Sequence, residues 1–190
     1  MKSKIFVVSG PSGSGKTSIL KRLFERKKIK KNFLKIPTYT TRSPRKNERR
    51  GVDYCFLSKD RFLDLKRKGF FLESKRFLQD FYGSPKSALK EAEKRGKFPV
   101  LCIDVEGATV VKEKFKDKAV LIFIAPPSKE ALVKRLRARN SEKESVLKKR
   151  LRIAKKEVKY AEKYHYQVVN DKLADTVEML ERILLKETSL

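Results

Sequence analysis

Near its amino terminus the chain reads Gly10-Pro11-Ser12-Gly13-Ser14-Gly15-Lys16-Thr17, and this stretch decides the fold class. It matches the pattern G-x-x-x-x-G-K-[ST], follows a β-branched apolar run and precedes a helical pattern. Glycines let backbone N–H groups turn inward around phosphate oxygens, and the next helix directs the positive end of its dipole at the same anion. The stretch therefore predicts a loop that binds a nucleoside triphosphate, with Lys16 at the β- and γ-phosphates and Thr17 on Mg²⁺.

Apolar runs alternate with helical patterns along most of the chain. This alternation is typical of an α/β protein, here a P-loop NTPase three-layer fold in which helices cover a parallel sheet. The predicted helices begin near Gly15, Glu106, Ser128 and Lys172. The predicted strands span residues 4–9, 99–104, 119–125 and 167–170.

Two segments interrupt this rhythm. Residues 37–85 are rich in Thr, Arg, Gly and Tyr, with only short alternating pieces, and we expect them to form an inserted substrate-binding subdomain. Residues 138–150 form a second insertion, which we expect to be a small lid. The rest, about 1–36, 86–137 and 151–190, is the expected core of one domain over 1–190.

Composition limits the possible environments and partners. No apolar run approaches the ~20 residues that a membrane span needs, and the first apolar stretch leads straight into the glycine loop, which favours a cytoplasmic protein without a membrane partner. Cys55 and Cys102 lie 47 positions apart, which fits neither a disulfide framework nor a zinc site. The net charge of +26 favours anionic partners, but the cations are spread along the chain with few aromatics between them. Nucleic acid is therefore a possible but not a required partner, and the oligomeric state stays open.

Polar residues of the first insertion suggest what receives the phosphoryl group. Arg42 and Arg45 lie three positions apart, and Tyr54 follows nine positions later. Guanidinium forks bind phosphate bidentately, and a tyrosine hydroxyl adds a donor. The chain has no N-K-x-D of a GTPase and is short for a motor ATPase, so it is best interpreted as a small-molecule kinase. Further polar groups for the pocket are Glu73, Tyr82-Gly83-Ser84 and Asp104.

From residue 40 to residue 57 the chain resembles the signature of the guanylate kinase family. The resemblance continues in order over nearly the whole chain, through Phe71-Leu72-Glu73, Tyr82-Gly83-Ser84, Asp104-Val105-Glu106-Gly107, Ala125-Pro126-Pro127-Ser128 and Val168-Val169-Asn170-Asp171. It implies in-line transfer of a phosphoryl group from ATP to GMP, and to dGMP, with Mg²⁺ as cofactor, in purine nucleotide metabolism.

The resemblance also implies roles for single residues. The GMP phosphate contacts Arg42, Arg45, Tyr54 and Tyr82; the guanine end of the site comprises Thr38, Glu73, Gly83, Ser84 and Asp104; and ATP contacts Arg139, Arg150 and Asn170 besides the loop. Lys16, Arg42, Arg139 and Arg150 are the implied catalytic residues. The chemistry agrees, because one carboxylate can accept both the N1–H and the 2-amino donors of guanine. Adenine lacks this pair of donors, so its binding would leave Glu73 desolvated and unpaired, at a cost of ~1–3 kcal/mol or more.

The chain departs from the family pattern at four positions, one of which is Thr38, where the family usually has a serine. Cys102 stands where the family usually has an acidic residue, Glu106 stands in place of a glutamine, and Asn47 in place of a glycine. We therefore expect a slower or altered metal-dependent reaction, partly relieved by Glu106. The alternatives are a kinase of another small phosphorylated acceptor, a non-catalytic guanylate-kinase-like interaction module, and a nucleic-acid-binding protein.

Overall fold

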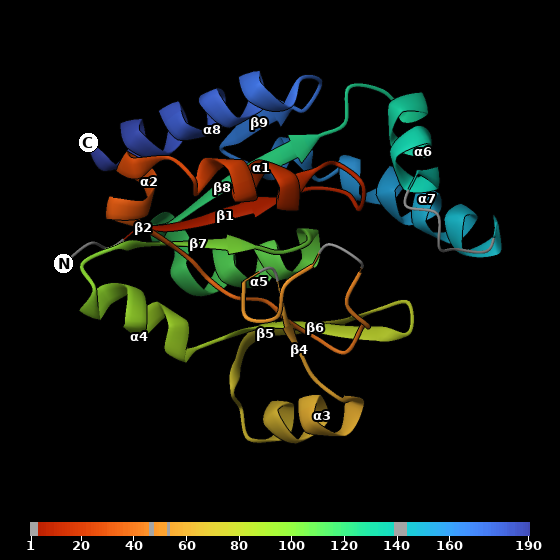
Figure 1. Ribbon diagram of the computed structural model, residues 1–190, viewed down its shortest axis with the longest axis horizontal. Coiled ribbons are helices and arrows are strands. Elements are labelled where there is room, and N and C mark those ends of the chain that lie inside the picture. Colours follow the sequence, from red (N-terminus) through yellow and green to blue (C-terminus); the bar gives the residue numbers. More distant parts are fainter. Residues whose placement is uncertain (1–3, 46–47, 53, 139–143) are drawn as a thin grey trace.

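A five-stranded parallel sheet forms the centre of the computed structural model, which describes residues 4–45, 48–52, 54–138 and 144–190. The strand order is β2-β7-β1-β8-β9 (Figure 1). The four predicted strands are confirmed to within two residues at each end, whereas the short edge strand β2 was not predicted. The bounds are β1 Ile5–Ser9, β2 Phe33–Lys35, β7 Phe98–Cys102, β8 Ala119–Ala125 and β9 Tyr166–Val169.

Helices cover both faces of this sheet, which confirms the three-layer prediction (Figure 1). One face packs against α1 (Lys16–Leu23), α2 (Lys27–Asn32) and α8 (Leu173–Thr188). The other packs against α5 (Val105–Phe115), with α4 (Ser87–Lys94) beside it. Successive residues of β1 point to opposite layers, so Phe6 packs with Leu180 and Val7 with Val111. Both sides of the strand are buried, which is why it reads as a continuous apolar run.

The predicted helix starts are confirmed as well. α1, α5 and α8 begin within one residue of the expected positions, and α6 (Lys129–Arg137) begins directly after Ser128. The Ser128 hydroxyl accepts a hydrogen bond from the Ala131 N–H at 3.1 Å, and Asp104 Oδ1 accepts one from the Gly107 N–H at 2.9 Å. These caps fix where α6 and α5 leave the carboxyl ends of β8 and β7.

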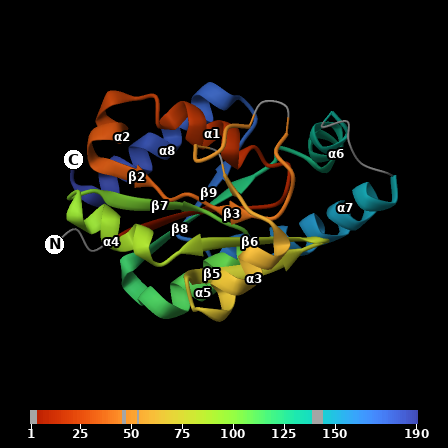
Figure 2. The same ribbon diagram turned by 60° about the horizontal axis from the view of Figure 1, so that its bottom comes forward.

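A second sheet lies beside the central one (Figure 2). Its strand order is β4-β3-β6-β5, and α3 (Lys59–Arg67) packs on it through Phe62, whose ring stacks 4.4 Å from that of Phe71. All these elements fall within the insertion expected at 37–85, but the division into core, insertion and lid stays a prediction. The strands are β3 Tyr39–Thr40, β4 Cys55–Phe56, β5 Phe71–Phe77 and β6 Asp80–Pro85.

Beyond the carboxyl ends of β1 and β8, α6 lies beside α7 (Glu144–Val158) (Figures 1 and 2). The two helices share a small core of Leu132, Leu136, Leu147 and Ala154. α7 runs without a break across residue 150, where we had placed the end of the lid. Two short 3-10 turns complete the chain at Lys116–Lys118 and Ala161–Lys163. Within the described ranges no helix is both long and apolar enough to cross a membrane.

Candidate active site

The glycine loop lies between the end of β1 and the start of α1, as predicted. Gly10 has a φ of 134°, and a Cβ there would lie 2.2 Å from the Ile124 carbonyl oxygen. Gly15 has a φ of 96°, and a Cβ there would lie 2.2 Å from Asn170 Nδ2. Both positions therefore require glycine on conformational and steric grounds. The Lys16 ammonium donates to the Gly10 and Pro11 carbonyls at 2.6 and 2.9 Å, which holds it over the loop.

Asn170 holds this loop from behind. Its Nδ2 donates to the Ser14 carbonyl at 2.7 Å, and its Oδ1 accepts a hydrogen bond from the Thr176 hydroxyl at 3.1 Å. The side chain is buried, and both ends of its amide are used inside the protein. Asn170 therefore acts here as a support of the loop, and its expected contact with ATP stays a prediction.

A pocket with a cavity volume of about 140 Å³ opens between the loop, the second sheet and α7. Most of the expected site residues line it, whereas Pro11, Ser14, Gly83, Ser84 and Asn170 do not, and Arg139 lies outside the described residues. The expected residues in the lining are Gly10, Ser12, Gly13, Gly15, Lys16, Thr17, Thr38, Arg42, Arg45, Tyr54, Glu73, Tyr82, Asp104 and Arg150.

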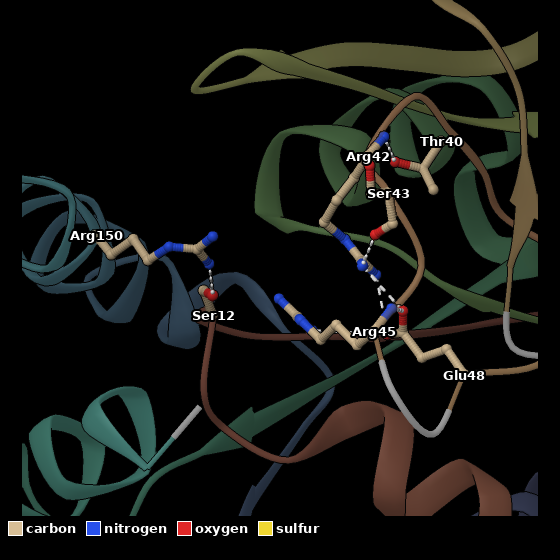
Figure 3. Close-up of polar contacts among 7 residues, drawn as sticks. All are labelled: Ser12, Thr40, Arg42, Ser43, Arg45, Glu48 and Arg150. Carbon is tan, nitrogen blue, oxygen red and sulfur yellow. Dashed lines mark hydrogen bonds and ion pairs between the residues drawn. The ribbon is translucent and has the colours of Figure 1, made fainter. Parts of the chain in front are cut away.

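Three arginines converge on the phosphate side of the pocket (Figure 3). Arg150 on α7 donates to the Ser12 hydroxyl at 3.0 Å, and Figure 3 shows Arg45, from the segment that follows β3, pointing toward this pair. Arg42 donates from both terminal nitrogens to Glu48, at 2.9 Å each, and Glu48 also accepts the Arg45 N–H at 2.9 Å. Glu48 thus orders both predicted phosphate-binding arginines, a role that the sequence analysis missed.

Tyr54 connects the second sheet with the phosphate loop. Its hydroxyl is hydrogen-bonded to Thr17, and burial is the main cause that raises the pKa of Tyr54 to about 12. The phenol is therefore neutral at physiological pH and keeps its proton as a donor. The Arg42 guanidinium lies 5.2 Å from the centre of the Tyr54 ring. The predicted phosphate-binding groups thus form one connected cluster.

Glu73 lines the same pocket from β5. Only 7% of it is exposed, and its Oε1 atom has no hydrogen-bond partner among the described residues. Burial, with a smaller effect of Asp104, raises the pKa of Glu73 to about 7, although Ser84 hydrogen-bonds the carboxylate and opposes the shift. Thr38 donates to the Cys102 carbonyl at 3.4 Å nearby. A buried acceptor without a partner is costly unless a ligand supplies the donor.

Three residues that line the pocket were not predicted from the sequence: Phe77, Ile103 and Glu157. Glu157 lies on α7 two turns beyond Arg150. Its pKa is raised overall, because the effect of burial outweighs the opposite effect of nearby Lys16. It is the only acidic residue among many cations between positions 145 and 161, and that signal could have identified it. Glu106, by contrast, is 78% exposed, pairs with Lys75 and does not line the pocket. Its suggested role at the metal therefore stays untested and lacks support from its position.

The donors in the pocket fit a magnesium ion that arrives with its nucleotide. The Thr17 hydroxyl lines the pocket at the start of α1, whereas the Cys102 thiol is a poor ligand for a hard cation. In the described ranges no three His, Cys, Asp or Glu residues cluster as a metal site. Mg²⁺ commonly keeps several waters and takes its other ligands from phosphates and one or two side chains. Thr17 with nucleotide phosphates matches that pattern.

The parallel sheet, the loop after its first strand and the pocket at its carboxyl edge define a P-loop protein of the phosphotransferase type. The family model described as guanylate kinase matches residues 2–187. The chain therefore belongs to the guanylate kinase family.

Relatives with this name match nearly the whole chain. Guanylate kinase of Clostridium tetani is 41% identical over 98% of this chain and 87% of its own length. That of the Wolbachia of Brugia malayi is 42% identical over 96% of this chain and 92% of its own length. The crystal structure of guanylate kinase from Anaplasma phagocytophilum has a TM-score of 0.77 at 33% identity, covering 97% of this chain and 85% of that one.

Proposed function

We propose that the protein transfers the γ-phosphoryl group of ATP to GMP, with dGMP as a second acceptor, and releases ADP and GDP. The single observation that carries the proposal is the buried Glu73 carboxylate, whose Oε1 atom has no hydrogen-bond partner among the described residues, in the same pocket as the phosphate loop. Guanine offers two adjacent donors to such a carboxylate. The Arg42, Arg45 and Tyr54 cluster lines the same pocket and suits the phosphate of a monophosphate.

The reaction needs no strong base in this pocket. An oxygen of the GMP phosphate is already an anion, so it attacks the γ-phosphorus while the bond to the β–γ bridging oxygen breaks and ADP leaves. Lys16 lies at the loop that would hold the donor phosphates, and Arg150 approaches from α7. Catalysis then rests on positioning and on charge neutralisation.

Magnesium, when bound with ATP, supplies positive charge that neutralises the β- and γ-phosphates. We propose Thr17 as its protein ligand. Cys102 lines the pocket nearby but supplies no carboxylate, and burial raises the pKa of its thiol. We therefore propose that nucleotide phosphates and water carry more of the coordination in this chain than in relatives with an acidic residue at that position.

A comparison of GMP with IMP tests the proposal. Hypoxanthine keeps the N1–H donor and lacks the 2-amino group, so it leaves the Glu73 carboxylate half-paired. We expect IMP to have a kcat/KM about 10- to 100-fold below that of GMP, from ~1–3 kcal/mol per lost hydrogen bond. Glu73→Gln should reduce this preference. Equal rates with both acceptors, or no ADP formation with either, would contradict the proposed function.

Nucleic-acid binding and a cytoplasmic location stay predictions. The outer face of α7 is the place where we would seek a polyanion contact, because its exposed cations are Lys148, Lys149, Arg152, Lys155 and Lys156. Binding there would weaken steeply with salt.

A further inference from the structure

Lys75 is a mostly buried cation beside the base end of the pocket. It lies on β5 on the same face as Glu73 and Phe77, since side chains alternate along a strand. Only 13% of its side chain is exposed, and it is not among the residues that line the pocket. Among the many cations of this chain, nothing in the sequence singles it out.

The Lys75 ammonium lies between two carboxylates of the α5 start. Its Nζ is 3.2 Å from Asp104 Oδ2 and 3.2 Å from Glu106 Oε2. The Asp104 side chain is 24% exposed and lines the pocket, whereas that of Glu106 is 78% exposed and lies outside it. Solvent and salt screen the exposed pair, so the pair with Asp104 matters for the site.

Asp104 is held at both oxygens. Oδ1 accepts the Gly107 N–H at 2.9 Å as the cap of α5, while Oδ2 faces Lys75. Gly107 in turn packs against Glu73, because a Cβ on Gly107 would lie 3.0 Å from Glu73 Oε2. The first turn of α5 therefore joins Asp104, Lys75 and Glu73 into one arrangement.

We propose that Lys75 is a positioning residue for the acceptor base: its ammonium fixes the Asp104 carboxylate at the pocket and balances the negative charge that Asp104 and Glu73 bring together. This proposal rests on the proposed function, because it treats these carboxylates as the groups that bind guanine. Lys75 does not touch the ligand and acts through its two neighbours.

The charges around Glu73 agree with this role. Asp104 raises the pKa of Glu73, and Lys75 lowers it along with the Ser84 hydrogen bonds, while burial gives the largest effect. The same holds for Glu157, which faces this region from α7: Asp104 raises its pKa and Lys75 lowers it. Burial lowers the pKa of Lys75, but Asp104 and Glu106 outweigh it and raise that pKa, so the ammonium persists through neutral pH. Without it, Glu73 would keep its proton to higher pH and lose its capacity to accept two donors.

The test is a set of three variants assayed from pH 6 to pH 9 for the KM of GMP and of ATP and for kcat. Lys75→Met removes the charge, Lys75→Arg keeps it, and Arg76→Met removes a cation from the opposite, exposed face of the same strand as a matched control. We expect Lys75→Met to raise the KM of GMP about tenfold at pH 7 and to move the acidic limb of kcat/KM for GMP upward by about one pH unit. The KM of ATP should stay within about twofold. Lys75→Arg should restore the wild-type limb, and Arg76→Met should match wild type.

Several results would overturn the proposal. The first is an acidic limb of kcat/KM for GMP that stays at the same pH in Lys75→Met. The second is an equal rise in the KM of GMP and of ATP. The third is a shift of that limb in Arg76→Met as large as in Lys75→Met. If Lys75→Met does not fold, as judged by its circular dichroism, Lys75→Gln is assayed in its place with the same expectations. The wild-type protein distinguishes failure of the proposed function from failure of the role of Lys75. Absence of GMP turnover in the wild type contradicts the proposed function. Turnover in the wild type, together with an unchanged pH dependence in Lys75→Met, contradicts only the role of Lys75.

Discussion

Arg42 and Glu48 form a bidentate ion pair in which both terminal guanidinium nitrogens lie 2.9 Å from carboxylate oxygens. Each side chain is only 12% exposed. Burial raises the pKa of Glu48, but the hydrogen bonds from Arg42 and Arg45 outweigh it, and the pKa is lowered overall. Glu48 therefore stays charged and holds the loop that carries both arginines toward the pocket.

From this pair we predict that Glu48→Ala weakens GMP binding rather than strengthening it. A partly buried charge-assisted hydrogen bond contributes about 1.5–3 kcal/mol, so a lost orientation of Arg42 should raise the KM of GMP about 10- to 100-fold. The KM of ATP should change little. Steady-state kinetics with each substrate varied would measure this. A lower KM for GMP would instead mean that Glu48 competes with the acceptor phosphate.

The second prediction concerns pH. With a raised pKa of about 7, Glu73 is protonated and neutral below that pH and ionised above it. The carboxylate is the form that accepts the guanine donors, so kcat/KM for GMP should fall about tenfold per pH unit below pH 7 and be level above it. The KM of ATP should lack this limb. In Glu73→Gln the limb with a midpoint near pH 7 should vanish; its persistence would assign the titration to another group.

The third prediction concerns Arg150, whose guanidinium donates to Ser12 in the phosphate loop. Arg150→Met should lower kcat about 100-fold or more, in the range of about 2.7–4 kcal/mol found when one donor to a transition-state charge is removed. The KM of GMP should change little. The control is Arg152→Met, which removes an exposed cation from the same helix. An equal decrease of kcat in both variants would mean that Arg150 contributes only to the overall positive charge of the helix and has no specific role at the phosphate loop.

A fourth prediction follows from Cys102, which lines the pocket at a position where the family resemblance implies a carboxylate. Cys102→Asp should lower the Mg²⁺ concentration that gives half-maximal rate, because a carboxylate near the cation strengthens its binding. Magnesium titrations at fixed, saturating ATP and GMP would measure it. An unchanged rate together with an unchanged cation dependence would refute the idea that Cys102 alters the metal step.

Sequence alone predicted much of this fold because its central strands are buried on both faces. β1 and β8 read as unbroken apolar runs, and Ser128 marks the start of α6. β2 was missed because it has only three residues, one of them Lys35, directly after a lysine-rich helix. It becomes a strand by pairing with β7, for instance Phe33 with Phe98, which no local pattern reveals.

The residues of the candidate site were also predicted only in part from the sequence. The loop and the arginines carry motifs, so they could be found in the sequence. Glu48, Lys75 and Glu157 matter through partners that are distant in sequence or through burial, and each is a common charged residue in a highly charged chain. The structure shows the amide of Asn170 holding Ser14 of the loop, a role that no local pattern indicates, and its expected contact with ATP stays a prediction. Such roles follow from tertiary packing and from hydrogen bonds that sequence patterns do not encode.

The most direct test of the central claim is ADP release from Mg²⁺-ATP with GMP, dGMP, AMP, CMP or UMP as the acceptor, with Lys16→Met as the inactive control. We predict turnover with GMP and dGMP, little or none with the other three, and GDP formed in equal amount to ADP in the GMP reaction. Comparable turnover with AMP, CMP or UMP would contradict the guanine-binding role of Glu73. Absence of turnover with every acceptor would contradict the kinase itself.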